Sequence, residues 1–113
     1  MTRVAAVAFT YLALVYPAWS ANVPGIYRGS FLYSLCESGN DADRARCAGY
    51  VAGAFSTLAD PALSKIALCP PDGTDLVQMV LITQKFMREH PEILNSSGSA
   101  VVSLALREAF ACR

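Results

Sequence analysis

Four cysteines and a single histidine are the residues of this 113-residue chain that are best suited to bind a metal, form disulfides or transfer protons. Cysteines of this kind serve either as disulfides or as metal ligands. No Cys-x-x-Cys pair is present, and His90 has no cysteine near it, so the spacing argues against zinc. We expect no metal ligands and no cofactor. The four cysteines are Cys36, Cys47, Cys69 and Cys112.

The histidine lies in a small group of residues that could act as acids or bases. His90 is followed by Pro91 and flanked by Glu89 and Glu92. A catalytic site needs a nucleophile, a base or a metal held together in space. A histidine at a helix end is more often a cap stabilised by the helix dipole, and glutamates on a turn are usually solvated. We therefore expect no catalytic residues and no enzyme.

The first 20 residues have the layout of a secretory signal peptide. Arg3 precedes an apolar run over residues 4–15, and Pro17 and small residues follow, which predicts cleavage after Ser20. The run is shorter than the roughly 20 residues of a membrane-spanning helix. We expect an exported protein of residues 21–113, which enters an oxidising compartment and has no stable membrane anchor. Four cysteines in that oxidising compartment indicate two disulfides, and three pairings are possible.

The length and charge of the predicted mature chain restrict its architecture and partners. Residues 21–113 suit one domain. The whole chain carries nine Lys and Arg against nine Asp and Glu. This balance gives no electrostatic reason to bind nucleic acid or an anionic membrane.

Apolar periodicity predicts four helices and hence an all-α, up-down bundle. We expect helices over residues 29–36, 42–60, 75–90 and 100–110. The predicted caps are Asp41 or Asp43 for the second helix, Asp72 or Thr74 for the third, and Ser97 or Ser99 for the fourth. The third helix is apolar more than half way round, which suits either a central helix or an interface.

The second helix carries a stripe of small residues. Ala45, Gly49 and Gly53 recur at a spacing of four. Glycine inside a helix costs about 1 kcal/mol relative to alanine. We therefore expect a closely packed neighbouring helix along this stripe.

An up-down arrangement selects one disulfide pairing. The end of the first helix and the start of the second share one end of the bundle, together with the 90–99 loop. The segment before the third helix and the end of the fourth share the other. The alternative pairings would join opposite ends, beyond the roughly 7 Å limit between alpha carbons. The expected bridges are Cys36–Cys47 and Cys69–Cys112.

Several segments carry a family resemblance, in the order GSFLYSLCES, CAGYVAGAF, CPPDG, MREHPEILN and ALREAFAC. Together they resemble the Rap/Tai family of type VI secretion immunity proteins, over residues 29–112. The sequence departs from the family pattern at Ala111, where proline is usual, and over residues 54–57, which lack an acidic residue.

The resemblance implies a periplasmic protein that binds and inhibits a peptidoglycan-cleaving amidase effector. In this family, toxin blocking is linked to a loop and to a homodimer of the immunity protein. We therefore expect the apolar third helix to supply a dimer surface. The residues expected to contact the toxin are Glu92, Ile93, Asn95 and Ser96.

Two other functions fit a small exported helical protein. One is a periplasmic acid-stress chaperone of the Hde type, which would expose apolar surface at low pH. The other is a structural exported protein without a toxin partner. Dye binding at low pH, with suppression of client aggregation, would favour the chaperone.

Overall fold

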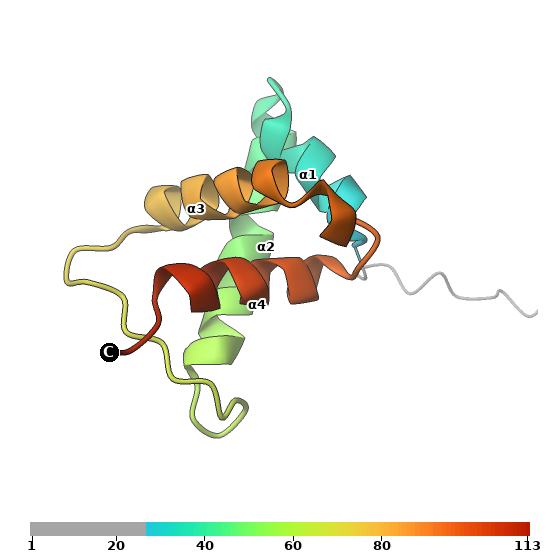
Figure 1. Cartoon of the computed structure of the whole chain (residues 1–113). Coiled ribbons are helices and arrows are strands. Elements are labelled where there is room, and N and C mark those ends of the chain that lie inside the picture. Colours follow the sequence, from blue (N-terminus) through green and yellow to red (C-terminus); the bar gives the residue numbers. More distant parts are fainter. Residues whose placement is uncertain (1–26) are drawn as a thin grey trace, which may run out of the picture.

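The computed structural model describes residues 27–113, which fold into four α-helices (Figure 1). They are α1 (Gly29–Glu37), α2 (Asp41–Ala59), α3 (Leu76–Glu89) and α4 (Gly98–Ala109), with a short 3-10 helix η1 (Pro91–Ile93) before α4. The described residues form no β-strand, so the predicted all-α fold of four helices is confirmed. The predicted signal peptide, residues 1–20, lies outside them. None of the helices within residues 27–113 has the length and apolar character needed to cross a membrane.

The three longer helices each begin at a side chain that accepts hydrogen bonds from the first turn. For α2 this is Asn40, whose side-chain oxygen accepts from the Ala42 amide at 2.8 Å. For α3 it is Asp75, which accepts from the Gln78 amide at 2.8 Å. Such a cap is worth about 1 kcal/mol.

The predicted caps are therefore confirmed for one helix and wrong for two. Ser97 caps α4, as expected. The second and third helices are not capped by the predicted alternatives, Asp41 or Asp43 and Asp72 or Thr74. In both places several adjacent residues have capping chemistry, and helical periodicity does not define the first turn to within one residue.

The core lies where all four helices meet. Each contributes a fully buried apolar side chain: Leu32 from α1, Val51 from α2, Met87 from α3, and Leu106 from α4. Burying such a side chain is worth about 1.5–3 kcal/mol relative to leaving it exposed. The fully buried Thr83 satisfies its hydroxyl by donating to the Met79 carbonyl at 2.9 Å.

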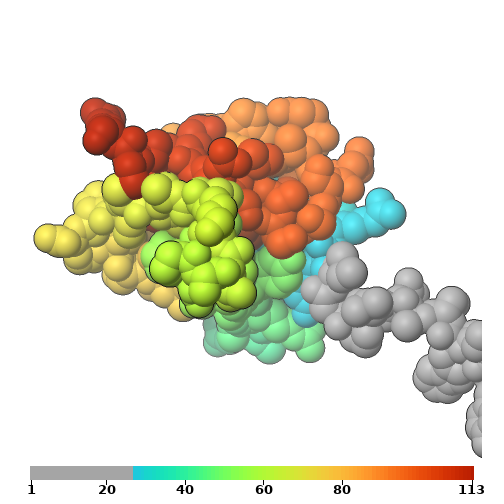
Figure 2. All heavy atoms as spheres, turned by 90° about the horizontal axis from the view of Figure 1, so that it is seen from below, coloured from blue at the N-terminus to red at the C-terminus, as the bar shows by residue number. Residues whose placement is uncertain are grey.

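Helices α3 and α4 run antiparallel, and α2 crosses them (Figure 1). The long connection over residues 60–75 makes this crossing possible, because α3 need not start beside the end of α2. Seen from below, the connection lies against the C-terminal segment (Figure 2). The α3–α4 loop consequently contacts the start of α1, where the Gly29 amide donates to the Ser96 carbonyl at 2.8 Å. We expected this loop at the Cys36 end of α1, which was wrong.

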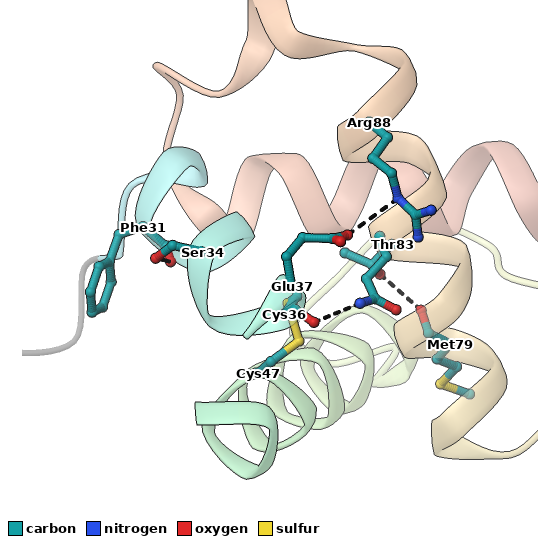
Figure 3. Close-up of a disulfide and its surroundings, with 9 residues drawn as sticks. Phe31, Ser34, Cys36, Glu37, Cys47, Met79, Thr83 and Arg88 are labelled. Atoms are coloured by element: carbon teal, nitrogen blue, oxygen red, sulfur yellow. Dashed lines mark hydrogen bonds and ion pairs between the residues drawn. A yellow bond between two sulfur atoms is a disulfide. The ribbon is translucent and has the colours of Figure 1, made fainter. Parts of the chain in front are cut away.

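The predicted disulfide pairing is confirmed. Cys36 and Cys47 join the end of α1 to the first half of α2, with alpha carbons 5.1 Å apart (Figure 3). Cys69 and Cys112 join the 60–75 connection to the C-terminal segment, with alpha carbons 5.0 Å apart. The Cys69 amide also donates to the Phe110 carbonyl at 2.8 Å. The C-terminal segment is therefore held both covalently and by a backbone hydrogen bond.

The small-residue stripe of α2 is not packed against a neighbouring helix, contrary to our expectation. Ala45, Gly49 and Gly53 are exposed. A Cβ atom built on either glycine would meet no atom within 4 Å. Helical spacing shows that these residues share a face, but it does not show which face another helix covers.

Replacing Gly49 or Gly53 by alanine is expected to raise the free energy of unfolding by about 0.5–1 kcal/mol each. The added methyl meets open space, while the unfolded chain loses conformational freedom. Urea denaturation of each variant measures the change. A loss of stability in the isolated protein would contradict the open face described above.

Candidate functional site

The α3–α4 loop, residues 90–97, begins where Pro91 disfavours continued helix. His90 is the C-cap of α3, and its backbone amide donates to the Phe86 carbonyl at 3.0 Å. Its ring lies 4.4 Å from the Phe86 ring, measured between centroids. The predicted structural role of His90 as a helix cap is therefore confirmed. The η1 turn then redirects the chain toward α1.

Backbone hydrogen bonds tie this loop to the start of α1. The amides of Gly29 and Ser30 donate to the carbonyls of Ser96 and Leu94, both at 2.8 Å. In the opposite direction, the Gly98 amide donates to the Tyr27 carbonyl at 2.5 Å. We call these bonds between residues 27–30 and 94–98 the loop clamp. No side chain caps α1, so the loop carbonyls satisfy donors that a helix start leaves free.

The loop clamp brings two segments of the backbone into close contact at Gly29 and Gly98. A Cβ on Gly29 would lie 2.9 Å from a methyl carbon of Val101 and 3.0 Å from the Leu94 carbonyl oxygen. A Cβ on Gly98 would lie 3.0 Å from the Tyr27 carbonyl oxygen and 3.1 Å from the Tyr50 hydroxyl oxygen. Both glycines are buried. Any side chain at either position would force the clamp apart.

Replacing Gly29 by alanine is expected to lower the free energy of unfolding by about 1–3 kcal/mol, the usual cost of overpacking. The new methyl would press on the Leu94 carbonyl, which accepts the Ser30 amide. Urea denaturation measures the loss. Gly49→Ala is the matched control, because the same change there meets open space. Equal stability of the two variants would contradict the close approach at Gly29.

One carboxylate, that of Glu92, gives the loop its local charge. The His90 Nδ1 atom lies 3.0 Å from a carboxylate oxygen of Glu92. A hydrogen bond from the Glu92 backbone amide and, to a smaller extent, the bond to His90 lower the pKa of this carboxyl below its usual value. The Glu92 side chain is two-thirds exposed, at 66%. The loop therefore presents a carboxylate that is fully charged at neutral pH.

The structure brings the four predicted contact residues together on this one loop. Glu92, Asn95 and Ser96 are exposed, whereas Ile93 is half-buried and packs against the core together with Leu94. The polar side chains thus extend from a loop that is packed against the core through Ile93 and Leu94 and is hydrogen-bonded to the start of α1. Such a loop can present a fixed set of hydrogen-bonding groups to a partner. Sequence reasoning missed Tyr27 and Arg28, which help to hold the loop, because no local pattern marks them.

A second exposed surface lies on α3. Val77 is 67% exposed and Leu81 is 55% exposed. They border a groove of about 430 Å³ between α2 and α3, with Arg44 at its edge and the Cys36–Cys47 disulfide among its lining. The other side of α3 supplies Met79, Phe86 and Met87 to the core. Helix α3 is therefore both a core helix and an exposed apolar face.

Within residues 27–113, no group of three His, Cys, Asp or Glu side chains is placed to hold a metal ion. Tyr50 stacks on Tyr27, with ring centroids 5.2 Å apart, and packs against the core. The two surfaces that stand out in residues 27–113 are the clamped polar loop and the exposed apolar face of α3.

Comparison with protein families gives a match that covers most of the chain. The family model of the Rap1a immunity proteins matches residues 28–112. The chain belongs to the Rap1a immunity protein family. No curated protein and no solved structure matches it. The region matched by the Rap1a model contains all four helices, both disulfides and every residue of the loop clamp except Tyr27.

Proposed function

We propose that this protein is a periplasmic inhibitor that binds a peptidoglycan-cleaving amidase effector of a type VI secretion system. Membership of the Rap1a immunity family, over residues 28–112, is the observation that carries the proposal. The protein acts by occupying a surface of the toxin and has no catalysis of its own. Its partner is a hydrolase, whose active site is expected to be a concave cleft.

The α3–α4 loop is the element proposed to enter that cleft. Inhibitors that change shape little on binding lose less conformational entropy, so a rigid loop suits this task. The loop clamp holds the backbone of residues 94–98, and the exposed Glu92, Asn95 and Ser96 extend from it. Ile93 is proposed to contribute its exposed edge to the same contact.

The proposed location requires that the first 20 residues are removed during export. Two disulfides suit an oxidising compartment. We predict that the mature protein begins at Ala21. Intact-mass measurement on periplasmic material tests this, and a mass that retains residues 1–20 would refute it.

We further infer that two copies associate through the exposed face of α3. Val77 and Leu81 lie beside the α2–α3 groove, so the same residues of a second copy can pack into it. An isologous contact of this kind repeats the same patch on both subunits. Val77→Lys with Leu81→Lys is expected to give a monomer in light scattering. The control Leu63→Lys changes a leucine that is 69% exposed on the 60–75 connection and should leave the dimer intact.

Co-expression with a periplasmically directed amidase tests the inhibitor function. Cells that carry the toxin alone should lyse, and cells that also carry this protein should survive, with the two proteins purifying together. An amidase made from the adjacent reading frame is the first candidate. Lysis in the presence of the folded protein, with no complex formed, would refute that pairing. Strong dye binding at low pH with suppression of client aggregation would instead support the chaperone function.

A further inference from the structure

The two disulfides differ sharply in their exposure to solvent. Cys36 is 4% exposed and Cys47 is fully buried, so the first bridge belongs to the core. Cys69 and Cys112 are both exposed, and they lie outside the helices. Thiol–disulfide exchange requires a thiolate to reach a sulfur atom, and access therefore controls its rate. The second bridge is the one that a solute can approach.

A hollow of about 410 Å³ adjoins this exposed bridge. Its lining includes Cys112 and two cationic residues, Lys65 and Arg107. Neither cation forms an ion pair with another of the residues 27–113. The neighbouring Glu108 lies in a different depression, beside Lys85 and Glu89. The approach to Cys112 is therefore bordered by positive charge.

We propose that the Cys69–Cys112 bridge is a site of thiol–disulfide exchange with anionic low-molecular-weight thiols. The incoming thiolate attacks the Cys112 sulfur, the bond between the two protein sulfurs breaks, and Cys69 leaves as a thiolate. Attack by a second thiolate on the mixed disulfide releases Cys112 and forms the oxidised small-molecule disulfide. Two electrons pass from the small thiols to the protein bridge.

The positive border acts on this reaction in two ways. Lys65 and Arg107 raise the local concentration of an anionic thiolate. In the second step they also favour the thiolate form of the released Cys112, and a more acidic leaving thiol departs faster. The buried bridge lies close to one cation, Arg44, but this side chain pairs with Asp41 and the sulfur atoms are covered. The rate of thiol–disulfide exchange at the exposed bridge can therefore be compared with the rate at the buried bridge of the same molecule.

Opening the exposed bridge would remove the covalent link at the C-terminal end of α4 and leave the backbone hydrogen bond from Cys69 to Phe110 as the remaining link to the 60–75 connection. The α4 helix has 12 residues and is about 18 Å long, and the loop clamp holds its start. The inference stands independently of the proposed inhibitor function, because it concerns the end of the domain away from the α3–α4 loop.

The test uses the purified oxidised protein and three thiols of different charge. Glutathione is anionic, 2-mercaptoethanol is neutral and cysteamine is cationic. Each reaction is stopped with an alkylating reagent, and the labelled cysteines are identified by peptide mass. Each rate is divided by the rate of the same thiol with an uncharged reference disulfide. Cys69 and Cys112 should be labelled well before Cys36 and Cys47, with glutathione favoured over cysteamine by about tenfold.

Lys65→Gln with Arg107→Gln should remove the preference for glutathione, and high salt should weaken it in the parent protein. Arg44→Gln is the matched control and should leave the preference unchanged. Equal labelling rates for the two bridges would overturn the proposal. So would a glutathione preference that persists in the Lys65→Gln, Arg107→Gln variant.

Discussion

Replacing Asn95 by Arg and Ser96 by Glu is expected to abolish binding of the amidase toxin while leaving melting temperature and helix content unchanged. Both side chains are exposed, and Ser96 takes part in the loop clamp through its backbone groups. The clamp therefore survives the change. Two long charged side chains would keep the loop out of a closely fitting cleft. Binding is measured by calorimetry, and stability by circular dichroism.

A matched variant separates the position of the charges from their presence. Ala62→Arg with Leu63→Glu adds the same two side chains to the exposed 60–75 connection. This variant should bind the toxin as tightly as the parent. If Asn95→Arg with Ser96→Glu also binds at parental strength, the α3–α4 loop is not the inhibitory element.

Removing the exposed disulfide, by Cys69→Ser with Cys112→Ser, is expected to lower the free energy of unfolding by a few kcal/mol. The affinity for the toxin is expected to stay unchanged. The bridge closes a separation of 43 residues that contains α3 and α4. Loop-closure entropy gives about 4 kcal/mol for this loop, against about 3 for the separation of 11 between Cys36 and Cys47. Urea denaturation measures the loss. Replacing both cysteines prevents a free thiol from forming new bridges.

Toxin binding by this variant should be measured below its unfolding midpoint. The α3–α4 loop is held by α1 rather than by the C-terminal segment, so affinity should persist if this loop contacts the toxin. Loss of binding in a folded Cys69→Ser, Cys112→Ser protein would show that the C-terminal segment controls the loop. Unchanged stability would show that the backbone bond from Cys69 to Phe110 is sufficient to hold that segment.

The helices and disulfides of this protein could be predicted from sequence because their signals are local or follow from connectivity. The first helix was expected over residues 29–36 and is observed over Gly29–Glu37. The exact caps were harder, since Asn40, Asp41 and Asp43 compete for one position. The cysteine pairing was predicted from which cysteines share one end of the bundle. The predicted pairs are the observed ones, although α2 crosses α3 and α4.

The candidate loop could be located from sequence, but its rigidity could not. Pro91 and the polar residues 95–97 mark a turn on chemical grounds. The partners of that turn are backbone groups of residues 27–30, and a backbone amide carries no side-chain signature. The glycines illustrate the same limit. Gly29 serves a close approach and Gly49 faces open space, yet both appear in the sequence simply as glycine within a helix.

The loop clamp also determines when the first helix can be completed. A ribosome releases the chain from its N-terminus, so residues 29–37 emerge well before residues 94–96. Until then, the first amides of α1 lack the carbonyl groups that cap them. A nine-residue helix is too short to persist in water without such partners. The first helix of the domain to be synthesised is thus completed only after residues 94–96 have emerged.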